Sequence, residues 1–392
     1  MQKNKILIFS TLYSPYEIGG AEKSTKLIAE EFANRNKSVH VICTANKNAL
    51  ISLNNVTVHY IKFKHIFWRY NSRNKSTFLK IIWRILEFYN PFNDRLIENK
   101  IKEIDPEIIF TNNIAGIGTR IWKIGRKMNL PILHTARDYY LICARSGMYK
   151  NKTACNNQCI ECKIYSLNKK KHSQYVNYFV GVSKFVQKIH LQNGYFKNVI
   201  KTNDIQNIFQ YDFKDISKKE SVKPIKFGIL GYIRETKGVN QLLQNINSEI
   251  ELEIIIAGKY GEDNYGKEFL NLVYSDSRVK FLGYQEPKLF FEKIDYLIHP
   301  AVWHEPFPRT LIEAFSFGKP VIAGLTGGTK EAITVNSTGF TYKDYTELNE
   351  ILKLITTKDI GYIKMSENCR EYAKKFSSKK IIDKYLDLFS SC

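Results

Sequence analysis

The strongest constraint on the fold is that short apolar segments recur along the chain in two separate series, with helix-like stretches between them. The segments expected to form strands are 5–11, 38–43, 56–63, 107–112, 132–135, 179–183 and 199–203 in the first series, and 226–230, 252–257, 279–282, 296–299 and 320–324 in the second. Helices are expected between them, among others at 21–35 and 184–193. Short buried strands that alternate with helices are typical of parallel, doubly wound sheets.

A polar stretch at 206–224 separates the two series and suits a linker. The length of 392 residues fits two domains. We expect a Rossmann-like α/β domain at 1–205, a second one at 206–377, and an amphipathic helix at 378–392 that packs back on the first domain. The two domains are expected to face each other across a cleft, because ligands of open α/β sheets bind outside the carboxyl ends of the strands.

Positive charge is concentrated in the first half of the chain. Of the net charge of +21, residues 1–205 carry +20, from 33 Lys and Arg against 13 Asp and Glu, whereas residues 206–392 carry +1, from 26 against 25. A basic domain attracts phosphorylated substrates, anionic lipid headgroups or nucleic acid. A general preference for Lys on solvated faces is the plainer explanation, but it leaves the neutral second half unexplained.

Apolar runs in this sequence are too short to cross a membrane. The longest, such as 6–9 and 252–257, have strand length and fall well below the ~20 residues of a spanning helix. The apolar run that follows the basic N-terminus is also too short for a signal peptide. We therefore expect a cytoplasmic protein.

The first segment whose residues suit ligand binding or catalysis, 231–238, lies between a predicted strand and a predicted helix. Arg234 and Lys237 are three residues apart on this loop. Pointing into the cleft, they would neutralise a diphosphate, which needs paired cations because its charge is spread over several oxygens. Taken alone, the pair says little, since basic loop residues are usually solvated.

The second segment, 305–313, places two carboxylates around the start of a predicted helix. Glu305 precedes the helix and suits sugar hydroxyls, whereas Glu313, about one turn inside, suits a ribose diol. Thr310 lies in the first turn, whose free amide groups suit phosphate oxygens. The plainer interpretation makes Glu305 a partner of the helix dipole and Glu313 a member of a surface ion pair.

A third segment, 326–331, follows the next predicted strand and contains the paired glycines Gly327 and Gly328. Glycines let the backbone approach a ligand closely because they lack a side chain. Together the three segments resemble the retaining glycosyltransferases of family 4, glycosyl transferases group 1, which have the GT-B fold. The residues that carry the resemblance are Gly19-Gly20-Ala21-Glu22, Arg234, Lys237-Gly238, the E-x7-E pair Glu305 and Glu313, and Gly327-Gly328.

This resemblance implies a retaining glycosyltransferase that binds a nucleotide-diphosphate sugar in the C-terminal domain and an acceptor in the N-terminal domain, with no obligatory catalytic metal. By the same resemblance Arg234 and Lys237 neutralise the diphosphate, Glu313 binds the ribose and Glu305 contacts the donor sugar. Gly19 and Gly20 would form a glycine loop beneath the phosphates. Pro308 stands where the family often has Gly, which leaves backbone contacts to the hexose open.

The family resemblance and the basic first domain together suggest the acceptor. We expect a membrane-associated saccharide on a polyprenyl diphosphate, used in the synthesis of a bacterial cell-surface polysaccharide. The enzyme would then work peripherally at the inner face of the cell membrane.

The loop after 132–135 offers a further residue for the reacting sugar. Family members often have His-Asp where Arg137-Asp138 stands here, with the His near that sugar. We expect Arg137 to lie in the cleft as a permanently charged substitute. His134 fits a strand residue whose hydrogen bonds are satisfied, but the sequence leaves open which of the two lies in the cleft. A merely structural role for Arg137 is the plainer alternative.

Four of the seven cysteines cluster in what reads as a polar loop rich in Lys and Asn. Cys143, Cys155, Cys159 and Cys162 have a spacing that fits a structural, tetrahedral zinc site, since clustered cytosolic cysteines favour metal over disulfides. The spacing is irregular, and unligated thiols in a poorly ordered loop fit it equally.

Residues 62–92 mix basic and aromatic side chains. The basic ones are Lys62, Lys64, Arg69, Arg73, Lys75, Lys80 and Arg84, and the aromatic ones are Phe63, Phe67, Trp68, Tyr70, Phe78, Trp83, Phe88 and Tyr89. Such a mixture suits the headgroup boundary of an anionic membrane. The part from 78 to 89 also fits an ordinary helix that faces a protein core.

Two other classes of function remain open. A sugar-nucleotide epimerase or phosphorylase on the same scaffold would need no lipid acceptor. A non-enzymatic basic protein would bind membranes or nucleic acid. The sequence shows no RNA-recognition, helix-turn-helix or zinc-finger signature, and paired carboxylates in the cleft would repel a phosphate backbone.

Overall fold

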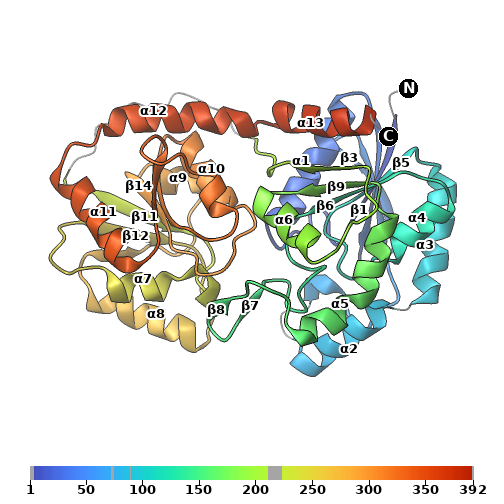
Figure 1. The fold of residues 1–392 in the computed structure, drawn as a ribbon, viewed down its shortest axis with the longest axis horizontal. Coiled ribbons are helices and arrows are strands. Elements are labelled where there is room, and N and C mark those ends of the chain that lie inside the picture. Colours follow the sequence, from blue (N-terminus) through green and yellow to red (C-terminus); the bar gives the residue numbers. More distant parts are fainter. Residues whose placement is uncertain (1–3, 72–74, 89, 211–222, 391–392) are drawn as a thin grey trace. The chain divides into compact units, whose positions relative to one another are not determined.

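The computed structural model describes residues 4–71, 75–88, 90–210 and 223–390 (Figure 1). The chain divides into two compact units. The first unit comprises residues 1–147, 157–210 and 378–392, and the second unit comprises 148–156 and 211–377. Most of the predicted linker lies outside the described residues, as do Arg73, Tyr89 and Cys392.

An eight-stranded sheet forms the first unit, in the order β10-β9-β6-β5-β1-β2-β4-β3. All neighbouring strands are parallel except β3, which pairs antiparallel with β4 at one edge. The strands are β1 (Lys5–Ser10), β2 (Ser38–Thr44), β3 (Ala49–Leu53), β4 (Val56–Ile61), β5 (Ile108–Thr111), β6 (Ile132–Ala136), β9 (Tyr178–Gly181) and β10 (Lys201–Asp204). The predicted parallel sheet is confirmed, but β3 was not predicted, because this edge strand leaves Leu50 and Ile51 exposed.

Helices cover the sheet of the first unit. They are α1 (Gly20–Asn34), α2 (Thr77–Phe88), α3 (Pro91–Ile104), α4 (Arg120–Lys127), α5 (Ile160–His172), α6 (Lys184–Gln192) and α13 (Ser378–Ser390), with short 3₁₀ turns η1 (Arg69–Asn71) and η2 (Ser173–Tyr175). Helix α5 corrects the sequence analysis, which read its Lys- and Asn-rich residues as a loop. Its inward positions are polar, so the usual apolar signal of a helix is missing there.

The last helix of the chain belongs to the core of the first unit. Tyr385 and Phe389 of α13 lie against Phe32 of α1 and Phe110 of β5, with ring centroids 5.2 to 6.4 Å apart. Aromatic pairs at such spacings add to the free energy gained from burial. The C-terminal segment therefore completes a core whose other residues come from positions 6–208.

A six-stranded, fully parallel sheet forms the second unit, in the order β13-β12-β11-β14-β15-β16. The strands are β11 (Lys226–Leu230), β12 (Glu253–Ala257), β13 (Val279–Phe281), β14 (Tyr296–His299), β15 (Val321–Gly324) and β16 (Gly339–Tyr342). Counted within the unit this order is 3-2-1-4-5-6, the arrangement of dinucleotide-binding Rossmann sheets. A small hairpin, β7 (Tyr149–Lys150) and β8 (Thr153–Ala154), also belongs to this unit.

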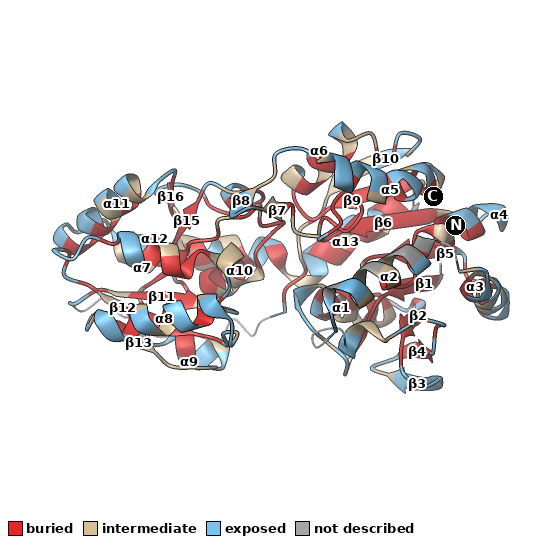
Figure 2. Cartoon of the chain, turned by 90° about the horizontal axis from the view of Figure 1, so that it is seen from below, coloured by how far each residue is buried: buried red, intermediate tan, exposed pale blue. Residues whose placement is uncertain are grey.

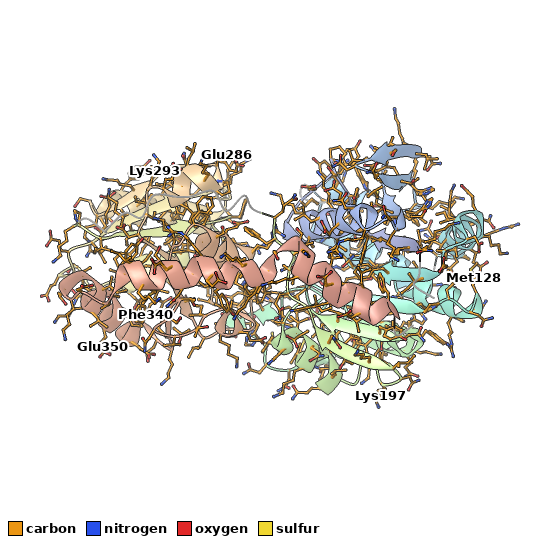
Figure 3. The ribbon with its side chains drawn as sticks, turned by 90° about the horizontal axis from the view of Figure 1, so that it is seen from above. Met128, Lys197, Glu286, Lys293, Phe340 and Glu350 are labelled. Atoms are coloured by element: carbon orange, nitrogen blue, oxygen red, sulfur yellow. The ribbon has the colours of Figure 1, made fainter. Side chains whose placement is uncertain are left out.

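The helices of the second unit complete its layers. They are α7 (Val239–Asn245), α8 (Asn264–Ser275), α9 (Pro287–Phe291), α10 (Arg309–Ser316), α11 (Tyr345–Thr357) and α12 (Tyr362–Ala373), with the 3₁₀ turns η3 (Glu235–Lys237), η4 (Thr329–Glu331) and η5 (Lys374–Phe376). The strands are buried and the outer sides of the helices are exposed (Figure 2). Phe340 of β16 is buried, whereas the charged Glu286, Lys293 and Glu350 reach the surface (Figure 3).

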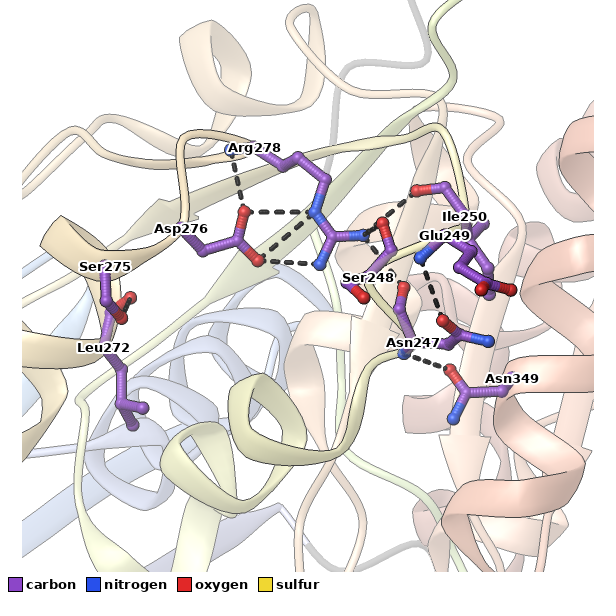
Figure 4. A network of polar contacts seen from close by, with 9 residues as sticks. All are labelled: Asn247, Ser248, Glu249, Ile250, Leu272, Ser275, Asp276, Arg278 and Asn349. Carbon is purple, nitrogen blue, oxygen red and sulfur yellow. Dashed lines mark hydrogen bonds and ion pairs between the residues drawn. The ribbon is translucent and has the colours of Figure 1, made fainter.

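A polar network holds the amino-terminal edge of the second sheet (Figure 4). Arg278 pairs with Asp276 at 2.7 Å and donates to the carbonyl oxygens of Asn247 and Ile250 at 2.9 and 3.0 Å. These bonds tie the segment before β13 to the segment before β12. The loops at the opposite, carboxyl-terminal edge carry the three motif segments.

The order of strands reverses between β1 and β5 in the first unit and between β11 and β14 in the second. At such a switch point the loops that follow the two central strands leave in opposite directions and open a crevice. In the second unit these loops are 231–238 and 300–308, which contain the first two of the motif segments.

Candidate active site

Glu305 is the centre of the candidate site in the second unit. Its buried Oε2 accepts hydrogen bonds from Lys237 Nζ at 2.7 Å and Trp303 Nε1 at 2.8 Å. His299 Nε2, at the end of β14, lies 3.7 Å from the same oxygen. All of these contacts involve Oε2.

Gly238 explains why the loops after β11 and β14 come together. This residue has a φ of 68°, and a Cβ there would lie 2.1 Å from the carbonyl oxygen of Pro300. Only glycine both adopts this left-handed backbone freely and lets the two loops approach so closely. Lys237, its neighbour, is thereby placed next to the loop that carries Glu305.

The paired glycines of the third segment also pack on Glu305. Gly328 donates its backbone N–H to the carbonyl oxygen of Glu305 at 2.8 Å. Gly327 has a φ of 52°, and a Cβ there would lie 2.5 Å from the same oxygen. The three motif segments therefore meet at one residue, with Lys237 on its side chain and the glycines on its backbone.

The surroundings keep Glu305 ionised. Burial alone would raise the pKa of Glu305, but the charge of Lys237, the nearby His299 ring and the hydrogen bond from Lys237 outweigh burial and hold this pKa well below its ordinary value. Burial also lowers the pKa of His299, against the opposing effect of Glu305. At neutral pH the site thus contains a carboxylate, an ammonium group and a neutral imidazole.

The indole of Trp303 lies near both cations of the first segment. The Arg234 guanidinium lies 5.9 Å and the Lys237 ammonium 6.0 Å from the centre of that ring. Arg234 is exposed, and it makes no ion pair within the described part of the chain. Its charge is therefore available to an anionic ligand.

Thr310 and Glu313 lie in α10, which begins directly after Pro308. Both side chains are half-buried. Helix α10 is anchored through its apolar face, where Leu311 and Phe315 are fully buried. The contacts of Thr310 with phosphate and of Glu313 with ribose remain predictions.

In the first unit, Arg137 follows β6 and is buried. Its Nε donates to Asn112 Oδ1 at 3.1 Å, and one amino group donates to Asn207 Oδ1. Its other amino group is buried without a hydrogen-bond partner in the described structure. A buried N–H without an acceptor is costly, so this group suits a ligand that supplies one.

His134 lies inside β6 and is held by aromatic neighbours. Its Nδ1 is 2.9 Å from Thr111 Oγ1, and its ring contacts Trp122 edge-on at a centroid distance of 4.9 Å. Burial lowers the pKa of His134 well below its ordinary value. A small cavity of about 10 Å³, room for about one water molecule, is lined by both His134 and Arg137, together with Asn112, Asn113, Ala136, Asp138, Tyr140 and Leu141.

Gly19 and Gly20 stand at the start of α1, also in the first unit. The backbone N–H of Gly19 donates to Glu22 Oε2 at 3.0 Å. Burial raises the pKa of the Glu22 carboxyl, and the negative charge of Asp138 adds to that effect. The predicted role of the two glycines beneath a diphosphate remains a prediction.

The structure does not support the predicted zinc site. No group of three or more His, Cys, Asp or Glu side chains is placed to hold a metal ion within the residues that it describes. Cys143, Cys159 and Cys162 belong to the first unit, whereas Cys155 follows β8 in the second. Burial raises the pKa of the Cys162 thiol to about 12.

The sequence analysis missed two residues of the Glu305 cluster, His299 and Trp303. Both precede Glu305 by a few positions in the same strand-to-helix connection. A search for donors next to the carboxylate would have found them. The hydrogen bond from Trp303 and the approach of His299 to Glu305 appear only once the turn of residues 300–305 is known.

The chain resembles known proteins in sequence and in fold. Residues 212–376 match the family model described as glycosyl transferases group 1. The second unit is a glycosyl transferases group 1 domain. An uncharacterized 42.6 kDa protein in the cps region of Klebsiella pneumoniae is 29% identical over 348 residues, which span 88% of this chain and 92% of that protein.

Solved structures resemble the whole chain. The crystal structure of Anabaena Alr3699/HepE in complex with UDP-glucose has a TM-score of 0.69 at 17% identity, over 99% of this chain and 100% of that one. WaaG, a glycosyltransferase involved in lipopolysaccharide biosynthesis, has a TM-score of 0.65 at 15% identity, over 99% and 100%. The fold is therefore GT-B, with two Rossmann-like units, as the sequence predicted. No helix of the described residues is both long and apolar enough to cross a membrane.

Proposed function

We propose that this protein is a retaining glycosyltransferase. It moves a hexose-type sugar from a nucleotide-diphosphate sugar to a saccharide held at the membrane on a polyprenyl diphosphate, in the synthesis of a cell-surface polysaccharide. The relative encoded in a cps region and the structural likeness to WaaG support this assignment. The UDP-glucose complex of HepE supports a nucleotide-sugar donor.

The pairing of Lys237 with Glu305 at the switch point is the observation that carries the proposal. A cation that reaches the diphosphate and a carboxylate that reaches the donor sugar must lie within one small site, because the bond that breaks joins these two groups. The 2.7 Å contact between Lys237 Nζ and Glu305 Oε2 meets that requirement. Arg234, which lies 5.9 Å from the centre of the Trp303 ring, adds a second positive charge.

In the proposed reaction the bond from the anomeric carbon to the phosphate oxygen breaks, and a bond from that carbon to the acceptor oxygen forms. Lys237, Arg234 and the amide groups at the start of α10 stabilise the charge that develops on the leaving diphosphate. The departing phosphate accepts the acceptor proton on the same face of the sugar. Glu313 binds the ribose, and Gly327 and Gly328 let the backbone pass close to the donor.

On the acceptor side we assign Arg137 to the reacting sugar. Its unpartnered amino group would donate to a sugar hydroxyl or a phosphate oxygen. Gly19 and Gly20 are assigned to the diphosphate, and the basic first half of the chain to the anionic surface on which the acceptor is held. The protein would thus act peripherally at the inner face of the cell membrane.

A thermal-shift panel of UDP, GDP, ADP and CMP tests the donor assignment. At a hundred times its dissociation constant, the correct nucleoside diphosphate should stabilise the fold by about 2.7 kcal/mol. Glu313→Ala should lose this shift. Glu350→Ala removes an exposed carboxylate of the same unit and should keep it.

Lack of a shift with every nucleotide would contradict the proposal. With the donor in hand, the anomeric configuration of the product, measured by NMR, tests retention. An inverted product would overturn the retaining mechanism, and an isomerised nucleotide sugar without acceptor would point to an epimerase.

A further inference from the structure

Helix α5 in the first unit has its apolar residues on the outside. Ile160, Ile164 and Leu167 are 76%, 66% and 63% exposed. Their spacing of four and then three residues places them on one side of the helix. An ordinary surface helix turns such a stripe toward the core. In α5 the apolar side faces solvent instead, and the polar side faces the core.

The inward side of α5 is polar and its hydrogen bonds are satisfied. Ser166 Oγ accepts from Gln158 Nε2 at 3.1 Å and donates to the carbonyl oxygen of Cys162 at 2.7 Å. Lys169 Nζ donates to the carbonyl oxygen of Tyr140 at 2.9 Å.

The end of the helix is held in the same way. His172 Nδ1 lies 2.9 Å from Thr119 Oγ1. A rotation of α5 that buried its apolar stripe would leave these polar groups without partners or in solvent, at a cost in free energy. The outward position of the stripe is therefore fixed by the fold.

Helix α2 adds exposed apolar side chains next to α5. Phe78 and Leu86 are 69% and 44% exposed. Tyr165 of α5 lies near the charges of Arg84 and Glu87 of α2. Both helices lie at the lower border of the first unit in Figure 1, and the view from below in Figure 2 shows the exposed side of α5. We call Phe78, Leu86, Ile160, Ile164 and Leu167 the α2–α5 face.

Cations accompany this face. Lys163 and Lys171 are exposed on α5, Lys170 is half-buried beside them, and Lys75 is exposed just before α2. The described outer side of α5 carries one acidic residue, Glu161. Exposed apolar residues flanked by lysines are the composition of helices that lie in the headgroup boundary of anionic membranes.

We propose that the α2–α5 face binds the surface of an anionic bilayer, with Ile160, Ile164 and Leu167 inserted among the headgroups. Exposed apolar residues gathered along one side of a helix and rimmed by polar residues mark an interaction site. A second copy of this chain is a poorer occupant, because each first half carries a charge of +20 and two such surfaces repel each other. This inference rests on the proposed function in one respect: the proposed acceptor is held at the membrane, and the α2–α5 face is the surface that would meet that membrane.

Vesicle sedimentation of the full chain tests the proposal. We expect binding to vesicles of phosphatidylglycerol and phosphatidylcholine, and at least tenfold weaker binding by the triple variant Ile160→Gln, Ile164→Gln, Leu167→Gln. The matched control, Leu289→Gln, Val335→Gln, Ile363→Gln, removes three exposed apolar side chains of the second unit and should bind like the wild type. Neutralising Lys163, Lys170 and Lys171 to Gln should weaken binding and reduce its dependence on salt.

Equal vesicle binding by the α5 triple variant and the wild type would overturn the proposal. So would a wild-type dimer, seen by sedimentation velocity, that the same variant dissociates, because the face would then bind a second copy. The unfolding temperature and the nucleotide-induced thermal shift of the variant should remain those of the wild type. If the wild type bound vesicles but showed no thermal shift with any nucleotide, the result would instead count against the proposed glycosyl transfer and leave the membrane proposal standing.

Discussion

The two units bury charge in different ways. The second unit buries the carboxylate Glu305 against the cation Lys237, in a contact of 2.7 Å. The first unit buries the cations Arg137 and Lys169 on neutral acceptors, the amide oxygens of Asn112 and Asn207 and the carbonyl oxygen of Tyr140. Neither of these cations makes an ion pair with a carboxylate among the described residues.

This difference matters for ligand binding. Burial lowers the pKa of both Arg137 and Lys169, which shows that their charged forms are held at a cost in free energy. Arg137 has an unused donor and would gain from an anionic or hydroxyl-bearing ligand. Lys237 already has a partner, so a diphosphate must share it with Glu305. The second unit is thus preorganised without ligand, whereas the first unit is completed by one.

Replacing Lys237 should have the largest effect. Lys237→Ala removes the cation from both the diphosphate and Glu305, so turnover should fall by roughly 100- to 1000-fold. Unfolding free energy should also fall, by about 3 kcal/mol, because the variant leaves a buried carboxylate unpaired. Enzyme assays and chemical denaturation measure the two effects.

Two variants serve as controls for Lys237→Ala. Lys293→Ala removes an exposed lysine of the same unit and should change neither quantity. Adding Glu305→Gln to Lys237→Ala should restore most of the lost stability but none of the activity. A double variant as unstable as Lys237→Ala would show that the ion pair is not what the second unit is organised around.

The contrasting prediction concerns Arg137. Arg137→Ala should lower turnover by roughly 10- to 100-fold, since it removes one charge-assisted contact to the acceptor. The nucleotide-induced thermal shift should persist, because the donor site lies in the other unit. Loss of nucleotide binding in this variant would contradict the proposal that the second unit binds the donor and the first unit binds the acceptor.

The smallest expected effect is the contribution of Lys169 to the pH dependence of the unfolding free energy. Burial lowers the pKa of Lys169 to about 7, against the opposing charges of Glu87 and Asp138. Above this pH the folded chain releases the proton that the unfolded chain keeps until near the ordinary pKa of 10.5. The unfolded state then binds more protons, so stability should rise with pH in this window.

Comparison with Lys169→Met isolates that contribution. From pH 7 to 9.5 the wild type should gain at most a few kcal/mol of unfolding free energy relative to the variant. Urea denaturation at a series of pH values measures the difference. Parallel pH profiles would mean that the folded chain keeps Lys169 protonated throughout, as a paired cation would be.

The sequence predicted the fold well because the central strands are buried on both faces. Strands such as β1 and β12 are continuous apolar runs that need no knowledge of their neighbours. Edge elements were missed for the opposite reason. Strand β3 is largely exposed, and β16 is a run of four residues with glycine at its start.

Contacts within the site were less predictable. The sequence picked out Glu305 and Lys237, but their separation of 68 positions in the chain hides their ion pair until the two loops meet at Gly238. Helix α5 shows the same limit. Its inward residues are polar and are held by hydrogen bonds to residues far away in the sequence. No periodic pattern in the sequence predicts such partners.

Diphosphate recognition by Lys237 is the central claim, and a calorimetric comparison tests it most directly. The nucleoside diphosphate selected by the thermal-shift panel and its monophosphate are titrated into wild type, Lys237→Ala and Lys293→Ala. We expect wild type and Lys293→Ala to bind the diphosphate at least tenfold more tightly than the monophosphate, and Lys237→Ala to lose most of that preference. An unchanged preference in Lys237→Ala would contradict the account.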